Sequence, residues 1–327
     1  MKQRKLGSEG LVVSAEGLGC MGMSAFYGPS DEAENLATLA RAIDLGITFF
    51  DTAEIYGPFK NEILLSKAFA GKRDKVLIAT KVGSEVSDAG ERLPVNGSPD
   101  YIRKAIERSL RHLGTDYVDL YYLHRIDPKV EIEESIGALK DLVGAGKVRY
   151  IGVSEASPAT IRRAHKVHPL TALQTEYSLF ERTPEQNEVL STVRELGIGF
   201  VSYSPLGRGF LSGQIKTIDD LDQTDFRRTD PRFSQENFDE NMRLVERITQ
   251  LAASKGVKAS QIALAWVMAQ GTVPIPGTRR VKYLEENAAA VEINLTSADL
   301  AALEEAAPVG AAIGERYTPQ GMASLNH

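Results

Sequence analysis

The sequence of 327 residues is poor in cysteine and in long apolar runs. A single cysteine, Cys20, cannot form a disulfide within the chain, and no apolar signal segment stands at the start. No apolar run approaches the ~18 residues that a membrane-spanning helix needs. We therefore expect neither a disulfide-stabilised secreted protein nor a membrane protein, and we predict a cytoplasmic location.

The chain also lacks an excess of basic charge. Its 38 Lys and Arg residues and 44 Asp and Glu residues give a formal net charge of −6, with the two signs interleaved. Nucleic-acid-binding proteins carry a broad basic face, and metal centres need runs of clustered ligands. Neither is present, so we expect no nucleic-acid partner and no bound metal.

What the chain contains is a regular alternation of strand and helix signals. After a hairpin over residues 2–14, eight apolar or β-branched stretches predict strands, each followed by a helical pattern. This order predicts a (β/α)8 TIM barrel forming one domain over residues 1–327, with an open doubly wound sheet as the alternative. The expected strands are residues 17–20, 47–50, 76–78, 118–123, 148–153, 172–175, 198–202 and 272–275.

Several expected helices have marked starts. Ser98, Ser157 and Thr183 each precede a proline, which places a hydroxyl at the N-cap and proline at the first helical position. Gln186 would complete a capping box with Thr183. The expected helices begin near residue 31 and cover residues 61–69, 99–113, 132–143, 158–166 and 184–196.

Two irregular stretches interrupt this order. Residues 206–238, after the seventh strand, carry glycines and mixed charges and predict a long loop, of the kind that often acts as a lid. Residues 308–327 carry prolines, glycines and Tyr317 after the last helix. This tail could fold back over a pocket.

Four reactive side chains stand at or just beyond the predicted strand ends: Asp51, Tyr56, Lys81 and His124. In a parallel barrel these ends meet at one face, where active sites occur. An ammonium beside a phenol favours the phenolate, a carboxylate can hold that ammonium, and an imidazole can orient a reacting oxygen. The set predicts proton donation to a carbonyl by Tyr56, with its pKa brought towards neutral by Lys81.

A glycine motif, Gly17-Leu-Gly19-Cys-Met-Gly22, fits the dinucleotide-binding fingerprint by spacing. That fingerprint opens a helix at once, whereas an irregular stretch follows here. We therefore interpret these glycines as serving a turn at the top of the barrel.

With these residues in view, the sequence resembles the aldo-keto reductase family over nearly its whole length, most closely the bacterial, fungal and plant branch. The resemblance rests on residues 51–57, 123–128 and 151–154, on Gln174, on residues 203–211, and on residues 275–280 with Glu286 and Asn287. It implies a barrel that binds NADP(H), with Asp51, Tyr56, Lys81 and His124 as the catalytic set.

The resemblance also implies cofactor contacts. Ser154 and Gln174 would face the nicotinamide carboxamide, Tyr203 would stack on its ring, and the backbone from Ser204 to Gly209 with Arg208 would meet the pyrophosphate. Glu155 departs from the asparagine that many relatives have after the serine, which leaves one carboxamide contact open. The adenosine 2′-phosphate would be held by Thr278 with Arg279 or Arg280. The further implied cofactor residues are Met21, Leu206, Gly207, Gly277, Glu286 and Asn287.

The leading hypothesis is an NADPH-dependent reductase of aldehydes or ketones. The alternatives are a nucleotide-bound interaction protein resembling potassium-channel β subunits, and a dehydrogenase of sugar or cyclitol alcohols. The oligomeric state and the carbonyl substrate stay open. The predicted pocket residues are Met23, Phe26, Tyr27, Arg125, Phe210 and the tail near Met322.

Overall fold

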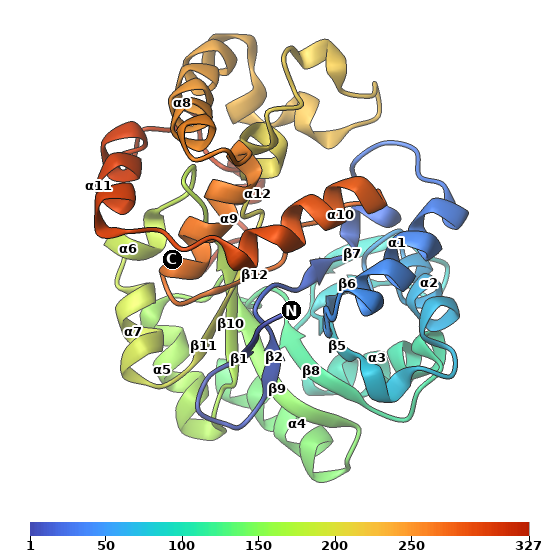
Figure 1. The fold of residues 1–327 in the computed structure, drawn as a ribbon. Helices are drawn as coiled ribbons and strands as arrows, with labels where there is room; N and C mark the ends of the chain where they lie inside the picture. Colours follow the sequence, from blue (N-terminus) through green and yellow to red (C-terminus); the bar gives the residue numbers. More distant parts are fainter. Residues whose placement is uncertain (327) are drawn as a thin grey trace.

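A computed structural model describes residues 1–326 and shows a barrel of eight parallel strands surrounded by helices (Figure 1). The strand order β12-β11-β10-β9-β8-β5-β4-β3 makes each strand pair with the barrel strand next to it in the chain. The TIM-barrel prediction is confirmed. The strands are β3 (Leu18–Gly19), β4 (Phe49–Asp51), β5 (Leu77–Val82), β8 (Val118–Leu123), β9 (Val148–Ser154), β10 (Ala172–Glu176), β11 (Gly199–Tyr203) and β12 (Val273–Pro274).

The first and last strands close the barrel where the glycine motif lies. The N–H of Gly19 donates to Pro276 O at 3.2 Å, and a Cβ at Gly19 would lie 2.7 Å from Ile275 O. A glycine is needed there because the two backbones approach so closely. Only a short 3-10 turn, η1 (Met21–Met23), follows. This supports our interpretation that the match to the dinucleotide fingerprint is accidental.

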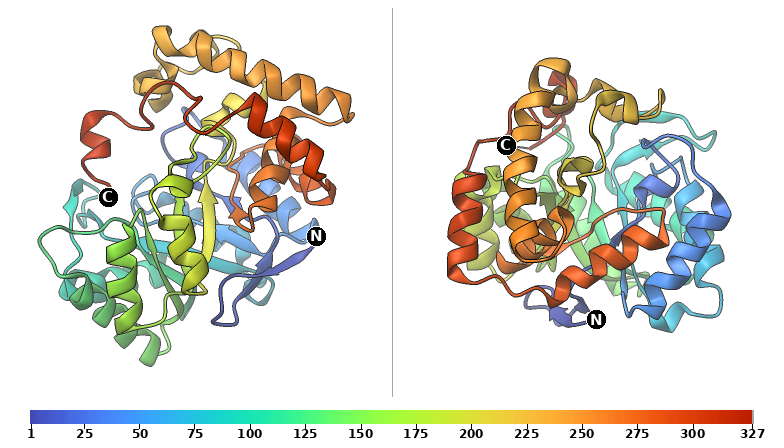
Figure 2. Two further views of the ribbon diagram at one scale, coloured as in Figure 1. Left: turned by 90° about the vertical axis from the view of Figure 1, so that its left-hand side faces the viewer. Right: turned by 45° about the horizontal axis from the view of Figure 1, so that its top comes forward.

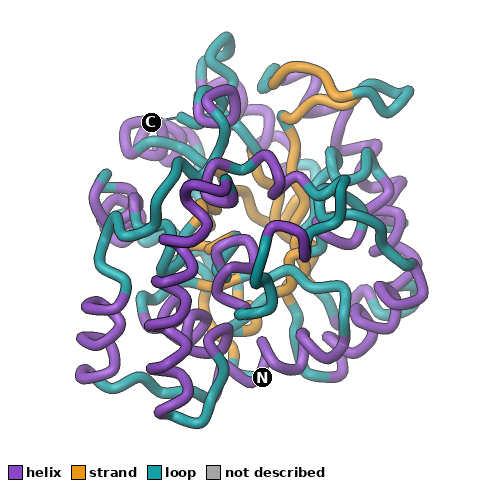
Figure 3. The backbone as a smooth tube through the Cα atoms, turned by 90° about the horizontal axis from the view of Figure 1, so that it is seen from above, coloured by secondary structure: helices purple, strands orange, loops and turns teal. Residues whose placement is uncertain are grey.

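Helices enclose the strands, as the view from above shows (Figure 3). The predicted caps at Ser98 and Ser157 are confirmed, since their side chains accept hydrogen bonds from the N–H groups of Tyr101 and Thr160. Across residues 1–326, no helix is both long and apolar enough to cross a membrane. The helices are α1 (Glu32–Asp44), α2 (Lys60–Phe69), α3 (Pro99–Leu113), α4 (Ile132–Gly144), α5 (Pro158–Val167), α6 (Thr183–Gln186), α7 (Val189–Glu195), α8 (Gln235–Ser254), α9 (Ala259–Ala269), α10 (Val281–Ala288), α11 (Ser297–Ala306) and α12 (Pro319–Met322).

The prediction of one helix over residues 184–196 with a capping box is wrong. The segment divides into α6 and α7, because Glu188 adopts a left-handed conformation with φ of 65°. Thr183 lies inside α6, whose N-cap residue Arg182 makes no side-chain cap bond. Arg182 is instead held by Glu185 at 2.7 Å, so a side-chain ion pair organises this start in place of the capping box.

Two hairpins flank the barrel. The predicted N-terminal hairpin, β1 (Gln3–Lys5) with β2 (Val12–Ser14), is confirmed. It lies at the end of the barrel opposite α8 and the long loop (Figure 2). A second hairpin, β6 (Ser84–Val86) with β7 (Arg92–Val95), stands between β5 and α3 and has no counterpart in the sequence prediction.

The long loop after the seventh strand is confirmed, and it contains a series of short 3-10 turns. It crosses to the segment after β3, where the N–H of Phe226 donates to Phe26 O at 3.0 Å. The C-terminal tail also returns to the barrel, since the N–H of Asn326 donates to Glu155 O at 3.2 Å. The turns of the loop are η3 (Gly207–Ser212), η4 (Ile218–Asp220), η5 (Phe226–Thr229) and η6 (Pro231–Phe233).

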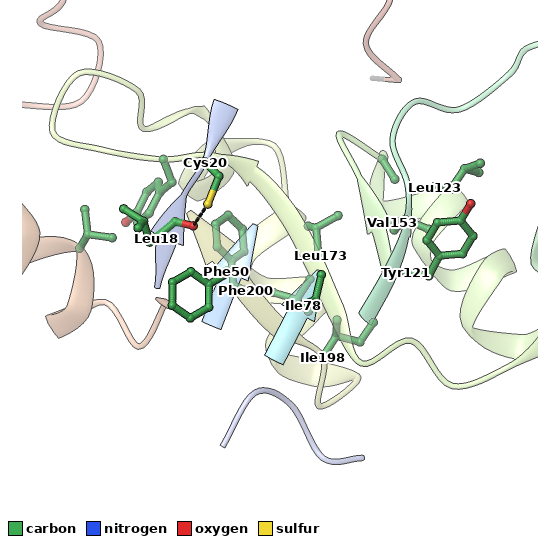
Figure 4. Close-up of a cluster of buried hydrophobic side chains, with 14 of the residues drawn as sticks. Leu18, Cys20, Phe50, Ile78, Tyr121, Leu123, Val153, Leu173, Ile198 and Phe200 are labelled. Atoms are coloured by element: carbon green, nitrogen blue, oxygen red, sulfur yellow. Dashed lines mark hydrogen bonds between the residues drawn. The ribbon is translucent and has the colours of Figure 1, made fainter. Parts of the chain in front are cut away.

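Alternation along each strand divides the core into two layers. Phe50, Ile78 and Phe200 point outward and pack against the helices, together with Leu18 and other residues drawn in Figure 4. Phe49 belongs to a second cluster that fills the barrel interior. Each strand therefore directs one row of side chains inward. At the C-terminal ends of the strands these inward side chains lie together at one opening of the barrel, called the mouth below.

Candidate active site

Strand alternation brings the predicted catalytic groups together. Phe49, Ala79 and Tyr122 belong to the interior cluster, so the residues two positions further on also face inward. Those residues are Asp51, Lys81 and His124. The same alternation, counted from interior residues of β9, β10 and β11, directs Ser154, Gln174 and Tyr203 into the same mouth.

The centre of the site is the buried ammonium of Lys81, which has no exposed surface. Its Nζ donates to Asp51 Oδ1, to Thr52 O at 2.8 Å and to the Tyr56 hydroxyl at 3.3 Å. Gln174 Nε2 donates to the other oxygen of Asp51 at 2.7 Å. A buried charge pair needs such further bonds to offset its loss of hydration. The site therefore holds a cation directly against a phenol.

The pKa values of Asp51 and Lys81 describe this pair. Burial raises the pKa of Asp51, although the Lys81 ammonium and the Gln174 amide oppose the rise. Burial alone would lower the pKa of Lys81, but Asp51 and Tyr56 outweigh it and the net direction is upward. The raised pKa of Asp51 favours its neutral acid, whereas the raised pKa of Lys81 favours its charged ammonium. Because two donors stabilise the Asp51 carboxylate, we assign the ionised pair at neutral pH.

The expectation that the pKa of Tyr56 is brought towards neutral is wrong in direction. Lys81 acts to lower the pKa of Tyr56, as predicted, but burial is the larger influence and the net pKa is raised. The phenol is therefore protonated at neutral pH. That is the state a proton donor needs before the reaction begins.

His124 lies edge-on to Tyr56, with ring centroids 6.1 Å apart and an interplanar angle of 84°. Burial lowers the pKa of His124 well below its ordinary value, and the charges of Arg125 and Lys81 lower it further. The ring is therefore neutral at pH 7, with one N–H to donate. Its buried Nδ1 has no hydrogen-bond partner within the described chain.

Residues predicted to contact a nicotinamide line the same mouth. Ser154 Oγ accepts from Arg125 Nη1 at 3.4 Å, and the Tyr203 hydroxyl lies 2.8 Å from that of Tyr317. Glu155 has φ of 52° and binds Arg316 with both carboxylate oxygens. Both of its carboxylate oxygens therefore already accept hydrogen bonds from Arg316.

The turn after β11 has an unusual backbone. Ser204, Gly207, Arg208 and Gly209 all have positive φ, and runs of this kind can point N–H groups at an anion. The buried Arg208 guanidinium, however, already binds the carboxylates of Glu176 and Asp230. Its contact with a pyrophosphate stays a prediction. The N–H groups of Gly207 and Gly209 likewise already donate, to Ser204 O and Leu206 O.

The predicted 2′-phosphate residues stand at the start of α10. The Thr278 hydroxyl accepts from the N–H of Arg280 at 3.1 Å, and Arg279 Nη1 donates to Pro29 O. Arg280 is largely exposed, and its Nε is 3.8 Å from Glu34. The structure brings two guanidinium groups to a helix start, which suits an anion.

The remaining predicted cofactor residues lie around this end. Met21 opens η1, Leu206 precedes η3, and Gly277 forms a parallel bridge with Gly19. Glu286 accepts from Ser260 Oγ at 2.6 Å and also binds Lys258, while Asn287 is buried on α10. Their cofactor contacts stay predictions.

The predicted substrate residues occupy different surroundings. Phe26 and Tyr27 pack edge-on against Phe226 of the long loop. Met23 is only 3% exposed and belongs to the main core cluster. Phe210 is fully buried and stacks on Phe180 in an aromatic cluster, so the expectation that it lines an open pocket is wrong.

Sequence reasoning missed the acidic residues that bind Arg208 at the mouth. Glu176 is an inward residue at the end of β10, and Asp230 lies in the long loop. Glu176 ends a strand next to Gln174, so its place in the mouth could have been inferred by alternation. Its partners could not, because they come from loops distant in sequence.

Comparison with known proteins agrees with this geometry. The family model described as Aldo/keto reductase family matches residues 17–308. The chain is 47% identical over 322 residues to the NADP(+) aldo-keto reductase yakc of Schizosaccharomyces pombe, covering 97% of this chain and 94% of the relative.

Solved structures are similar over the same length. A glycerol dehydrogenase from Gluconobacter oxydans has a TM-score of 0.86 at 28% identity, covering 97% of both chains. The holo form of an aldo-keto reductase from Bacillus halodurans has a TM-score of 0.81 at 30% identity, covering 97% of this chain and 99% of that one. With its buried tyrosine, lysine, aspartate and histidine at the mouth of an eight-stranded barrel, this chain belongs to the aldo/keto reductase family.

Proposed function

We propose that this protein reduces aldehydes or ketones to alcohols with NADPH, and that Tyr56 is the proton donor. The observation that carries the proposal is the contact of the Tyr56 hydroxyl with the buried Lys81 ammonium at 3.3 Å, beside neutral His124. The NADP(+) named for the relative in Schizosaccharomyces pombe supports the choice of cofactor.

The polar and aromatic groups at the mouth of the barrel are chemically suited to bind NADP(H). Ser154, Gln174 and Tyr203 would hold the nicotinamide end, and the backbone of residues 204–209 would meet the pyrophosphate. Thr278, Arg279 and Arg280 would hold the 2′-phosphate, since guanidinium groups and helix-start N–H groups bind phosphate oxygens. When bound, this cofactor supplies the hydride that reduces the carbonyl carbon.

Side chains of the protein would stabilise the charge on the carbonyl oxygen and supply its proton. A carbonyl oxygen that accepts hydrogen bonds from Tyr56 and His124 becomes more negative as its carbon is reduced. Tyr56 then gives its proton to that oxygen, because an alkoxide is more basic than a phenolate. Lys81 stabilises the phenolate left behind, and Asp51 keeps Lys81 charged and oriented.

The oxidative direction would use the same groups in reverse, and similarity to a glycerol dehydrogenase keeps it as the alternative. Oxidation requires Tyr56 to accept a proton as phenolate. Burial raises the pKa of Tyr56, which disfavours the phenolate at neutral pH. The protonated phenol fits the role of proton donor in reduction.

Steady-state oxidation of NADPH with 4-nitrobenzaldehyde tests the proposal. The Tyr56→Phe variant keeps the ring but loses the proton, so we expect turnover to fall by about 10²–10⁴-fold. Titration of both proteins with NADPH should give similar dissociation constants. Near-normal reduction by Tyr56→Phe, or tight NADPH binding without turnover in the unmodified protein, would contradict the proposed activity; the latter result fits an interaction protein.

A further inference from the structure

Arg125, which is half-buried, differs from the buried arginines around the mouth. Arg208 binds Glu176 and Asp230, Arg232 binds Glu181, and Arg316 binds Glu155. Arg125 has no carboxylate within ion-pair distance in the part of the chain that the structure describes. Its recorded bonds run from Nη1 to the carbonyl of His124 at 2.7 Å and to Ser154 Oγ at 3.4 Å.

The nearby carboxylates are committed to other partners. Glu155 acts on Arg125 electrostatically, but Arg316 occupies both of its oxygens. Asp51 is similarly held by Lys81 and Gln174. Because each of these carboxylates is paired with its own cation, no carboxylate within residues 1–326 forms an ion pair with Arg125.

The neighbouring cluster around Glu176 does not supply the missing charge. The Glu176 carboxylate contacts Arg208, Arg232 and Arg316, the last two at 3.8 and 3.9 Å, and has no ion pair with Arg125. A partly buried guanidinium with no counter-ion among the described residues gains electrostatic energy when an anion binds to it.

The remaining donors of Arg125, Nε and Nη2, make no hydrogen bond within residues 1–326, and the side chain is only half-buried, so both atoms keep some exposed surface. Nη1 of the same guanidinium donates to Ser154 Oγ, which places the group at the mouth. Arg125 follows His124 directly in the chain, and its charge acts on Tyr56, so these donors lie beside the proposed reaction centre.

We propose that Arg125 binds a carboxylate of the substrate, so that the preferred substrates are aldehydes or ketones that also carry a carboxylate. A guanidinium offers two parallel N–H groups that match the two oxygens of a carboxylate. The proposal rests on the proposed carbonyl reduction and specifies its substrate class.

The test compares each acid with its own uncharged ester. Glyoxylate, succinic semialdehyde and 4-carboxybenzaldehyde place the carboxylate at different distances from the carbonyl, and the methyl esters keep the size but lose the charge. We expect kcat/KM of the unmodified protein to favour at least one acid over its ester by about tenfold or more, as a charge-assisted hydrogen bond allows.

The Arg125→Met variant should remove that preference, and Arg125→Lys should retain part of it. Arg111→Met, on the exposed surface of α3, is the matched control for loss of one positive charge and should keep the preference. No preference for any acid, or an equal loss for acids and esters in Arg125→Met, would overturn the inference. A tenfold loss of NADPH affinity in that variant would also overturn it, by assigning Arg125 to the cofactor.

A binding measurement separates this inference from the proposed activity. Calorimetry of the NADP-loaded protein with 4-(hydroxymethyl)benzoate and its methyl ester needs no turnover. Selective binding of the acid that Arg125→Met weakens by about tenfold supports the subsite even if the protein reduces no carbonyl. Equal binding of acid and ester would refute the subsite while leaving carbonyl reduction intact.

Discussion

Glu155 and Arg316 are joined by two hydrogen bonds, from Nη1 to Oε1 at 2.9 Å and from Nη2 to Oε2 at 2.6 Å, across 161 positions of sequence. Burial acts to raise the pKa of Glu155, but Arg316 holds it below its ordinary value. The next residue, Tyr317, reaches the hydroxyl of Tyr203. This pair therefore anchors the C-terminal tail at the mouth, beside a residue predicted to contact the nicotinamide.

Breaking this pair should destabilise the protein. Glu155→Gln leaves the buried Arg316 guanidinium without its carboxylate, which typically costs about 3–5 kcal/mol. Adding Arg316→Met removes the stranded charge, so the double variant should be more stable than Glu155→Gln alone. Urea unfolding of both single variants and the double variant gives the coupling energy, and simple additivity would show that the two side chains do not depend on each other.

Removing Lys81 should affect stability and activity separately. Lys81→Met strands the buried Asp51 carboxylate, so we expect a loss of about 3–5 kcal/mol. Asp51→Asn in the same chain should recover much of that stability but no activity, because Tyr56 still lacks its ammonium. Unfolding curves and NADPH oxidation measure the two effects. A double variant no more stable than Lys81→Met would argue against the pairing.

Any residual activity of Lys81→Met should also change its pH dependence. The ammonium acts to lower the pKa of Tyr56, so its removal raises that pKa further. The protonated donor then persists to higher pH, and the alkaline limb of the reduction profile should move upward. An unchanged limb in a still-active variant would contradict the role assigned to Lys81.

Cofactor choice should depend on the start of α10. Neutralising both Arg279 and Arg280 removes charge-assisted bonds of roughly 1.5–3 kcal/mol each to the phosphate that distinguishes NADPH from NADH. The Arg279/Arg280 double alanine variant should therefore lose NADPH affinity by about 10²-fold or more and NADH affinity by little. Lys282→Ala, an exposed neighbour, controls for the general loss of positive charge. Equal losses for both cofactors would move the phosphate site elsewhere.

Glu16 should make stability fall with rising pH. It is 1% exposed, neither carboxylate oxygen has a partner among residues 1–326, and burial raises its pKa from the ordinary 4.5 to about 8. The folded state holds this proton more tightly than the unfolded chain. The contribution of protonated Glu16 to the free energy of unfolding is therefore full below about pH 4.5. It is lost, by up to roughly 5 kcal/mol, as pH rises through about 8.

Glu16→Gln isolates that contribution, because the amide does not titrate in this range. Its gain in unfolding free energy over the unmodified protein should grow between pH 5 and about 8. Glu9→Gln, on the exposed turn of the hairpin, is the control for loss of a formal charge. A constant difference across this range would show that Glu16 ionises normally.

The sequence was sufficient for the barrel and for the catalytic group. Strand alternation is local, so the position of Asp51, Lys81 and His124 two residues beyond interior side chains could be anticipated from chain order and parallel topology. Helix starts with a proline after serine were predictable for the same reason. The single-domain assignment, the cytoplasmic location and the cofactor contacts stay predictions.

Sequence alone determined that this chain forms a barrel whose strand ends bear a tyrosine, a lysine, an aspartate and a histidine, because periodicity and capping depend on neighbouring residues. Tertiary structure decided which arginines at the mouth have a carboxylate partner within residues 1–326. Carboxylates from distant segments pair with Arg208 and Arg316, whereas none within residues 1–326 pairs with Arg125. It also decided that burial outweighs Lys81 at Tyr56. Desolvation and ion pairing depend on which segments pack together in space, and that information is absent from residue spacing.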